Sequence, residues 1–162
     1  MKTAAIVLLT AVLILGGLMG YGLFNTSLAV VGKALQTFPA TELPNEFLAL
    51  KNAMEQRSLL GTVLNQSDLK DPEEYTYYVY TLRLKNPGLV AAEMVEMQIA
   101  PLPQDVLFYG PGEEIIIAPG KTYDIQCVLL TKGETHPVRD LHITYYLWGH
   151  PQEVIHTYDY AY

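Results

Sequence analysis

The sequence predicts an all-β fold: an antiparallel β-sandwich of about seven strands, preceded by an N-terminal transmembrane helix and a short amphipathic helix. Residues 4–24 form an uncharged apolar run, whereas beyond Ser58 apolar and polar residues alternate with a period of two. That alternation is typical of half-buried strands. Turn-forming clusters such as Asn86-Pro87-Gly88 and Pro119-Gly120 separate the alternating stretches.

The apolar run at residues 4–24 is long enough to cross a bilayer, because its helical length would be about 30 Å. We therefore expect residues 1–31 to be a retained signal-anchor. A cleaved secretory signal is the alternative, although its apolar region is usually shorter. Lys2 before the run predicts a cytoplasmic N-terminus and an extracytoplasmic C-terminal domain. Gly16 and Gly20 form a GxxxG spacing, which favours helix packing in the membrane and a homodimer through the anchor.

Residues 32–57 are expected to form a juxtamembrane linker and a short helix over residues 45–57. The apolar side chains of this helix recur at spacings of three and four: Phe47, Leu50 and Met54. Asn45 is the expected N-cap. The apolar stripe is most simply a face that packs against the following domain, and a docking face for a partner is the alternative.

Residues 58–162 are long enough for one domain, and we expect seven strands in it. The predicted strands are residues 59–64, 75–85, 93–99, 114–117, 122–130, 140–148 and 153–160. No long helix separates them, which favours an antiparallel sandwich of immunoglobulin-like type. The alternation predicts the following inward side chains: Tyr78, Tyr80, Leu82, Leu84, Val95, Met97, Ile99, Tyr123, Ile125, Cys127, Leu129, Leu141, Ile143, Tyr145 and Leu147.

Charge and cysteine content narrow the classes of function. The formal net charge is −7, and an acidic surface is repelled by phosphate backbones and anionic lipid headgroups. Neither nucleic-acid binding nor peripheral membrane binding through a basic patch is therefore expected. Cys127 is the only cysteine, which excludes an internal disulfide. Because Cys127 falls on the inward side of its strand, we expect an inert core thiol.

Outward residues on two predicted strands are the candidate binding surface. They are Tyr77, Val79, His142, Tyr146 and Trp148. Exposed aromatic side chains of this kind fit a protein or glycan partner. If the helix at residues 45–57 covers them, they are a packing surface instead.

No sequence motif predicts a catalytic site or a metal site. His142 follows Asp140 by two residues, so their side chains share a strand face, but a metal site needs three or four ligands. Glu113-Glu114 lies in a predicted loop and is expected to be a solvated acidic turn. There is no Gly-x-Ser-x-Gly motif. We therefore expect a non-enzymatic protein with no catalytic residue, no cofactor and no metal.

Two turn motifs support a family resemblance. A strand ending in Leu84-Lys85-Asn86-Pro87-Gly88 is followed by alternation from Ala92 to Ile99 and then by Ile117-Ala118-Pro119-Gly120-Lys121. This pattern resembles the immunoglobulin-fold modules of prokaryotic surface proteins, including the CARDB-like adhesion-related group. The resemblance implies an extracytoplasmic binding or spacer module without catalysis, and it assigns no functional residue.

The expected protein is thus a single-pass protein of the cell membrane, with a binding or adhesion module on its extracytoplasmic side that recognises a protein or glycan. The alternative is a structural accessory subunit of a larger membrane or cell-envelope complex, assembled through the anchor and the juxtamembrane helix.

Overall fold

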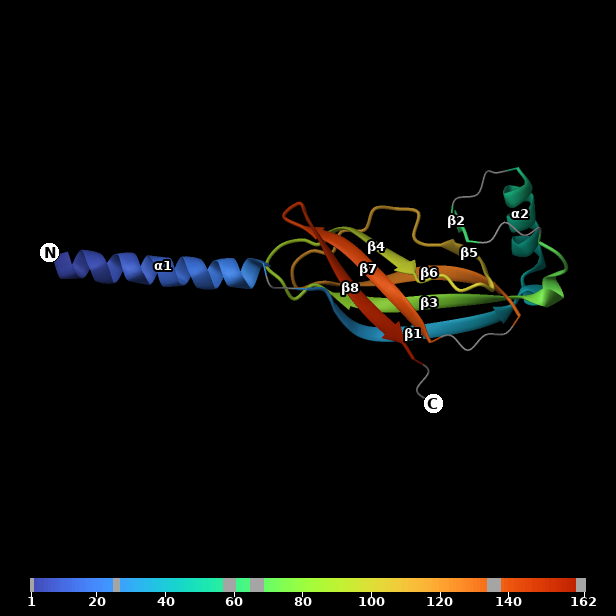
Figure 1. Cartoon of the computed structure of the whole chain (residues 1–162), viewed down its shortest axis with the longest axis horizontal. Helices are drawn as coiled ribbons and strands as arrows, with labels where there is room; N and C mark the ends of the chain where they lie inside the picture. Colours follow the sequence, from blue (N-terminus) through green and yellow to red (C-terminus); the bar gives the residue numbers. More distant parts are fainter. Residues whose placement is uncertain (1, 25–26, 57–60, 65–68, 134–137, 160–162) are drawn as a thin grey trace.

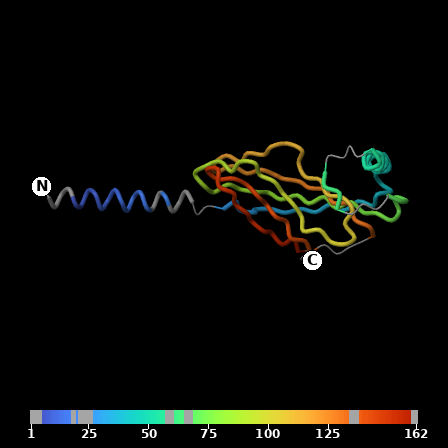
Figure 2. Tube along the Cα trace, turned by 45° about the horizontal axis from the view of Figure 1, so that its top comes forward, coloured from blue at the N-terminus to red at the C-terminus, as the bar shows by residue number. Residues whose placement is uncertain are grey.

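The computed structural model describes residues 2–24, 27–56, 61–64, 69–133 and 138–159. The protein is mostly β, with two antiparallel sheets that share a core, and α1 projects from one end of them (Figure 1; Figure 2). The helices are α1 (Lys2–Phe24) and α2 (Pro44–Glu55), with 3-10 turns η1 (Ala40–Glu42) and η2 (Pro72–Glu74). The strands are β1 (Ala29–Pro39), β2 (Thr62–Val63), β3 (Tyr75–Lys85), β4 (Glu93–Ile99), β5 (Asp105–Tyr109), β6 (Thr122–Lys132), β7 (Arg139–Leu147) and β8 (His150–Tyr158).

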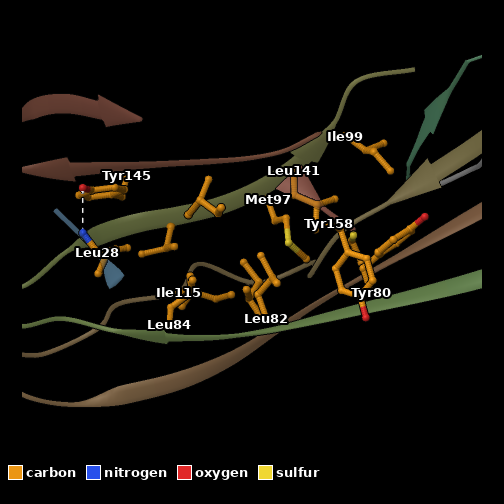
Figure 3. Packing of buried hydrophobic residues seen from close by; sticks show 14 of the residues in the cluster. Leu28, Tyr80, Leu82, Leu84, Met97, Ile99, Ile115, Leu141, Tyr145 and Tyr158 are labelled. Carbon is orange, nitrogen blue, oxygen red and sulfur yellow. Dashed lines mark hydrogen bonds between the residues drawn. The ribbon is translucent and has the colours of Figure 1, made fainter. Parts of the chain in front are cut away.

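The five-stranded sheet has the order β1-β3-β6-β5-β2, and the three-stranded sheet has the order β4-β7-β8. The alternation predicted for β3, β4 and β7 is confirmed, because every predicted inward residue of these strands is buried. Their side chains interdigitate between the sheets (Figure 3). Tyr123 is the exception: it lies near the start of β6, where the first three residues are exposed, and it is 37% exposed itself.

The short helix predicted over residues 45–57 is confirmed as α2, and its apolar stripe packs on the outer face of the five-stranded sheet. Phe47 is buried there, and its ring lies 5.4 Å from that of Tyr75. The predicted cap is wrong, because the helix begins at Pro44 and Asn45 lies inside it. Proline suits a first helical position, where its missing N–H has no intrahelical acceptor. Arg57, the last residue of the predicted helix, lies outside the described residues.

Residues 29–39, expected to be anchor and linker, form β1 instead, so the sheets begin well before the predicted boundary at residue 58. β1 pairs with β3 from Ala29 opposite Lys85 to Pro39 opposite Thr76. The register shifts between Val30 and Gly32, which interrupts the alternation. An edge strand with a bulge and small residues gives little periodic signal.

Three other parts of the strand prediction differ from the structure. β5 was not predicted, because nearly all its residues are buried and a strand covered on both faces does not alternate. Residues 114–117 form only one bridge, Ala92 to Ile117, although Ile115 and Ile117 are buried. Of the predicted strand at residues 59–64, the structure has only β2, and residues 59 and 60 lie outside the described residues.

A buried ion pair joins the two sheets. Arg139 of β7 donates to both carboxylate oxygens of Asp105 of β5, at 2.7 and 3.1 Å, and both side chains are almost fully buried. Asp105 also accepts from the Leu102 amide at 2.6 Å. Tyr80 of β3 lies beside Arg139; burial raises the pKa of Tyr80, and the Arg139 charge opposes that shift. The bidentate geometry fixes β5 against β7.

A second contact between the sheets lies at the end where the chain leaves α1. The amide of Leu28, just before β1, donates to the Tyr145 hydroxyl of β7 at 3.1 Å (Figure 3). Leu28 itself is buried in the common core. The chain is therefore held to both sheets within a few residues of the end of α1.

The described side chains of α1 from Ile6 to Leu15 are exposed. Within the part of the chain that the structure describes, no helix has both the length and the apolar character needed to cross a membrane. The transmembrane assignment of residues 4–24, and packing through Gly16 and Gly20, stay predictions.

Asp105→Asn should lower the free energy of unfolding by about 3–5 kcal/mol, because it leaves the Arg139 guanidinium buried without a counter-charge. Urea unfolding of the full chain, followed by far-UV circular dichroism, measures the change. The double variant Asp105→Leu with Arg139→Met should recover most of the loss, since an apolar pair needs no counter-charge. A single variant as stable as the wild type would contradict the role given to the pair.

Candidate functional site

The predicted outward residues are divided between the two sheets. Tyr77 is only 3% exposed, since it packs with Phe47, Leu69 and Leu107 beneath α2. The expectation that it belongs to an exposed patch is wrong, because α2 covers that face. Val79 is half-buried on the same strand, β3.

His142, Tyr146 and Trp148 lie on the other sheet. His142 and Tyr146 are on the outer face of β7, and Trp148 is at the turn between β7 and β8. His142 Nδ1 lies 2.6 Å from an oxygen of Glu153 on β8. Asp140, the predicted companion of His142, accepts a hydrogen bond from Thr157 at 2.7 Å instead. Whether these residues bind a partner stays a prediction.

Cys127 lies in the core and is poorly placed to act as a nucleophile. Cys127 is 1% exposed, and burial raises the pKa of its thiol to about 12. A thiol in this state is almost wholly protonated at neutral pH and is a poor nucleophile. Among the described residues, no three His, Cys, Asp or Glu side chains are grouped as metal ligands.

An open groove of about 620 Å³ lies between β4 and the loop at residues 110–115, with β2 at one side. We call it the β4 groove. Its apolar lining residues are Leu64, Val95, Met97, Ile99, Phe108 and Ile115. All of them except the half-buried Leu64 are buried in the common core and form the floor of the groove. Three carboxylates also line it: Glu96 of β4, and Glu113 and Glu114 of the loop.

The β4 groove is acidic, because three carboxylates line it and none of its described lining residues is basic. Glu113 is 3.5 Å from the Tyr123 hydroxyl, a long contact, while Glu96 and Glu114 form no ion pair within the described chain. A solvated acidic turn was predicted at Glu113-Glu114. The prediction missed that β4 brings a third carboxylate opposite it.

Met94 lies at the mouth of the β4 groove in an unusual backbone conformation. Its φ is +51°, and the β4 register shifts between Glu93 and Glu96, as a β-bulge does. The side chain is 51% exposed. A left-handed conformation is costly for a residue with a side chain, and such strain is concentrated at functional sites.

Met94 and Glu96 also line a second hollow, of about 500 Å³, on the outer face of the three-stranded sheet. Tyr146, one of the predicted binding residues, lines this hollow together with Thr144, Pro151 and Glu153. Met94 therefore lies between the β4 groove and the predicted binding surface that includes Tyr146. Methionine is flexible and polarizable, and it adapts to partners of different shape.

No protein-family model matches the chain, and no curated protein has significant sequence similarity to it. The assignment of function therefore depends on the geometry of the chain itself.

Cys127 should resist alkylation by a thiol reagent at pH 8 in the folded full-length protein, because its thiol is buried and protonated. Mass spectrometry after timed exposure to iodoacetamide measures the modified fraction. Addition of urea through the unfolding transition should bring modification to completion. Rapid modification without denaturant would show that Cys127 is accessible, contrary to its burial.

Met94→Gly should leave the free energy of unfolding unchanged or raise it by up to about 1 kcal/mol, because glycine adopts positive φ without steric cost. The matched control is Gln98→Gly on the same exposed face of β4, where glycine should cost roughly 0.5–1 kcal/mol. Urea unfolding of both variants measures the difference. If both variants lose the same free energy of unfolding, the backbone at Met94 is not strained.

Proposed function

We propose that the chain is a non-enzymatic binding module that α1 anchors in the cell membrane, with its sandwich on the extracytoplasmic side. Its partner is a protein, and a segment that carries basic side chains next to an apolar one occupies the β4 groove. The finer fold class, an immunoglobulin-like sandwich similar to CARDB-like modules, belongs to this proposal. The two facing sheets with a common core support it.

The observation that carries the proposal is the combination of an apolar lining with three carboxylates in one groove. A volume of about 620 Å³ lies in the range of known ligand sites, roughly 300–1,000 Å³. The exposed Met94 and the half-buried Leu64 present apolar surface in the groove, which favours an apolar side chain. Glu96 and Glu114, which form no ion pair within the described chain, favour Lys or Arg beside it. Exposed pairs contribute only about 0.2–1 kcal/mol each, so the carboxylates give specificity more than affinity.

The membrane part of the proposal is supported by the sequence and by the shape of the molecule. Residues 4–24 carry no charge. α1 extends away from both sheets (Figure 1). Its described apolar side chains from Ile6 to Leu15 are exposed. A helix apolar on all sides is stable in lipid or against other apolar helices.

The second candidate is a structural accessory subunit. A Cβ placed on Gly16 or Gly20 would meet no described atom within 4 Å, so this face of α1 is open to pack against another helix in the membrane. In that case α1 and not the β4 groove would carry recognition. α2 is not available for assembly through Phe47, because Phe47 is buried against the sheet.

Peptide selection on the full chain in lipid nanodiscs tests the β4 groove. Peptides from a phage-displayed random library should be enriched in Lys or Arg next to an apolar residue. Glu96→Gln combined with Glu114→Gln should weaken the selected peptides by about 10-fold in titration calorimetry, because two ion pairs are lost.

The matched control is Asp71→Asn combined with Glu73→Gln, which removes the same charge from exposed positions near η2, away from the groove. This control should bind the peptides as the wild type does. Equal weakening by both double variants would mean that net charge, and not the β4 groove, attracts the peptides. Enrichment of acidic or neutral peptides would also refute the assignment.

A further inference from the structure

Three connections meet at the end of the sandwich next to α1: residues 86–92, residues 118–121 and the turn at residues 148–149. We call them the α1 end. Lys85 pairs with Ala29 at the start of β1 and with Thr122 at the start of β6, which places the first two connections there. The contact of Leu28 with Tyr145 brings the β7–β8 turn to the same end. Figures 1 and 2 both show this arrangement.

The β7–β8 turn presents the only tryptophan of the chain to solvent. Leu147 pairs with His150, so Trp148 and Gly149 form a two-residue turn, and both have positive φ, +53° and +73°. Asn-Gly or Asp-Gly is the preferred sequence for such a turn. Trp148 is 61% exposed, so core packing does not explain a tryptophan at this position.

Leu89 is exposed on a connection that hydrogen bonds hold in place. The buried Asn86 side chain donates to the carbonyls of Val90 and Ile117 at 2.6 and 2.9 Å, and accepts from the Gly88 amide at 2.9 Å. The Asn86 carbonyl accepts from the Gly120 amide at 2.8 Å, which joins the second connection. Leu89 therefore projects outward from a fixed loop and is 68% exposed.

The covalent connection to α1 limits how far the α1 end can lie from the end of that helix. Four chain steps separate Phe24 from Leu28, so their Cα atoms are at most about 14 Å apart. Trp148 lies three residues beyond Tyr145 on the side of α1, about 10 Å along β7. The headgroup layer of a bilayer is roughly 5–8 Å thick on each side. If α1 spans the hydrocarbon, Trp148 reaches that layer.

The charge of the α1 end suits a lipid surface, although the whole chain is acidic. None of residues 86–92, 118–121 and 148–149 is acidic, although Glu93, which follows the first connection and pairs with Tyr146 of β7, is exposed. Lys121 and the flanking Lys85 are exposed. Basic side chains near a bilayer are attracted to anionic headgroups, and tryptophan is enriched at the interface.

We propose that the α1 end contacts the bilayer in which α1 is anchored, with Trp148 and Leu89 in the headgroup layer and Lys85 and Lys121 against anionic lipid. This inference rests on the membrane anchor of the proposed function. It adds a second membrane contact, made by the β domain itself, and does not depend on the β4 groove.

Because Trp148 is the only tryptophan, its fluorescence reports on the α1 end directly. The full chain is placed in nanodiscs of zwitterionic and anionic phosphatidyl lipids, with or without bromine high in the acyl chains. We expect a blue-shifted emission, protection from iodide, and loss of emission when the lipid carries bromine. Trp148→Phe combined with Ile155→Trp is the matched control.

Ile155 has a similar exposure, 57%, but lies on β8 about 17 Å from the turn, so its replacement should be quenched by iodide and not by bromine. Iodide access to Trp148 without bromine quenching would overturn the inference while leaving the anchor intact. Protection from both quenchers would also overturn it, because a protein would then cover Trp148. Extraction of the chain by alkaline carbonate would refute the anchor itself.

Discussion

The buried ion pair between Arg139 and Asp105 determines how the two sheets are held together. It joins β7 to β5 across the core, and β7 is the neighbour of β4 while β5 is the neighbour of β2. β4 and β2, which lie on either side of the β4 groove, are therefore each hydrogen-bonded to a strand that carries one residue of the ion pair. Both charges are out of water, so each needs the other, and this makes the spacing of the sheets at the groove well defined.

The strands that the sequence predicted correctly share one property. β4, β7 and β3 from Tyr78 onward each have one side toward the common core and the other toward a less buried environment, so their side chains alternate. β5 could not be recognised, because its residues are buried on both sides. β1 could not be recognised either, since its bulge and its small residues weaken the pattern. Local periodicity reports burial, and it fails where burial does not alternate.

The candidate site was less predictable than the fold. Glu96 and Glu114 come from a strand and a loop that the fold brings together, and no local pattern indicates this. The same limit explains Tyr77, whose outward direction was inferred correctly from alternation but whose exposure depends on where α2 packs. The left-handed conformation of Met94 also has no signal in the sequence, because methionine is not a residue that favours it.

The position of β1 has a mechanical consequence. Its N-terminal end follows α1 closely, and it is an edge strand paired antiparallel to β3 along almost its whole length. A force applied through α1 and directed along β1 would slide β1 past β3. Such a force loads the backbone hydrogen bonds of the ladder together, in shear, and does not open them one at a time. β1, which the sequence pattern did not predict, is thus the strand that would transmit tension between α1 and a partner bound to the sandwich.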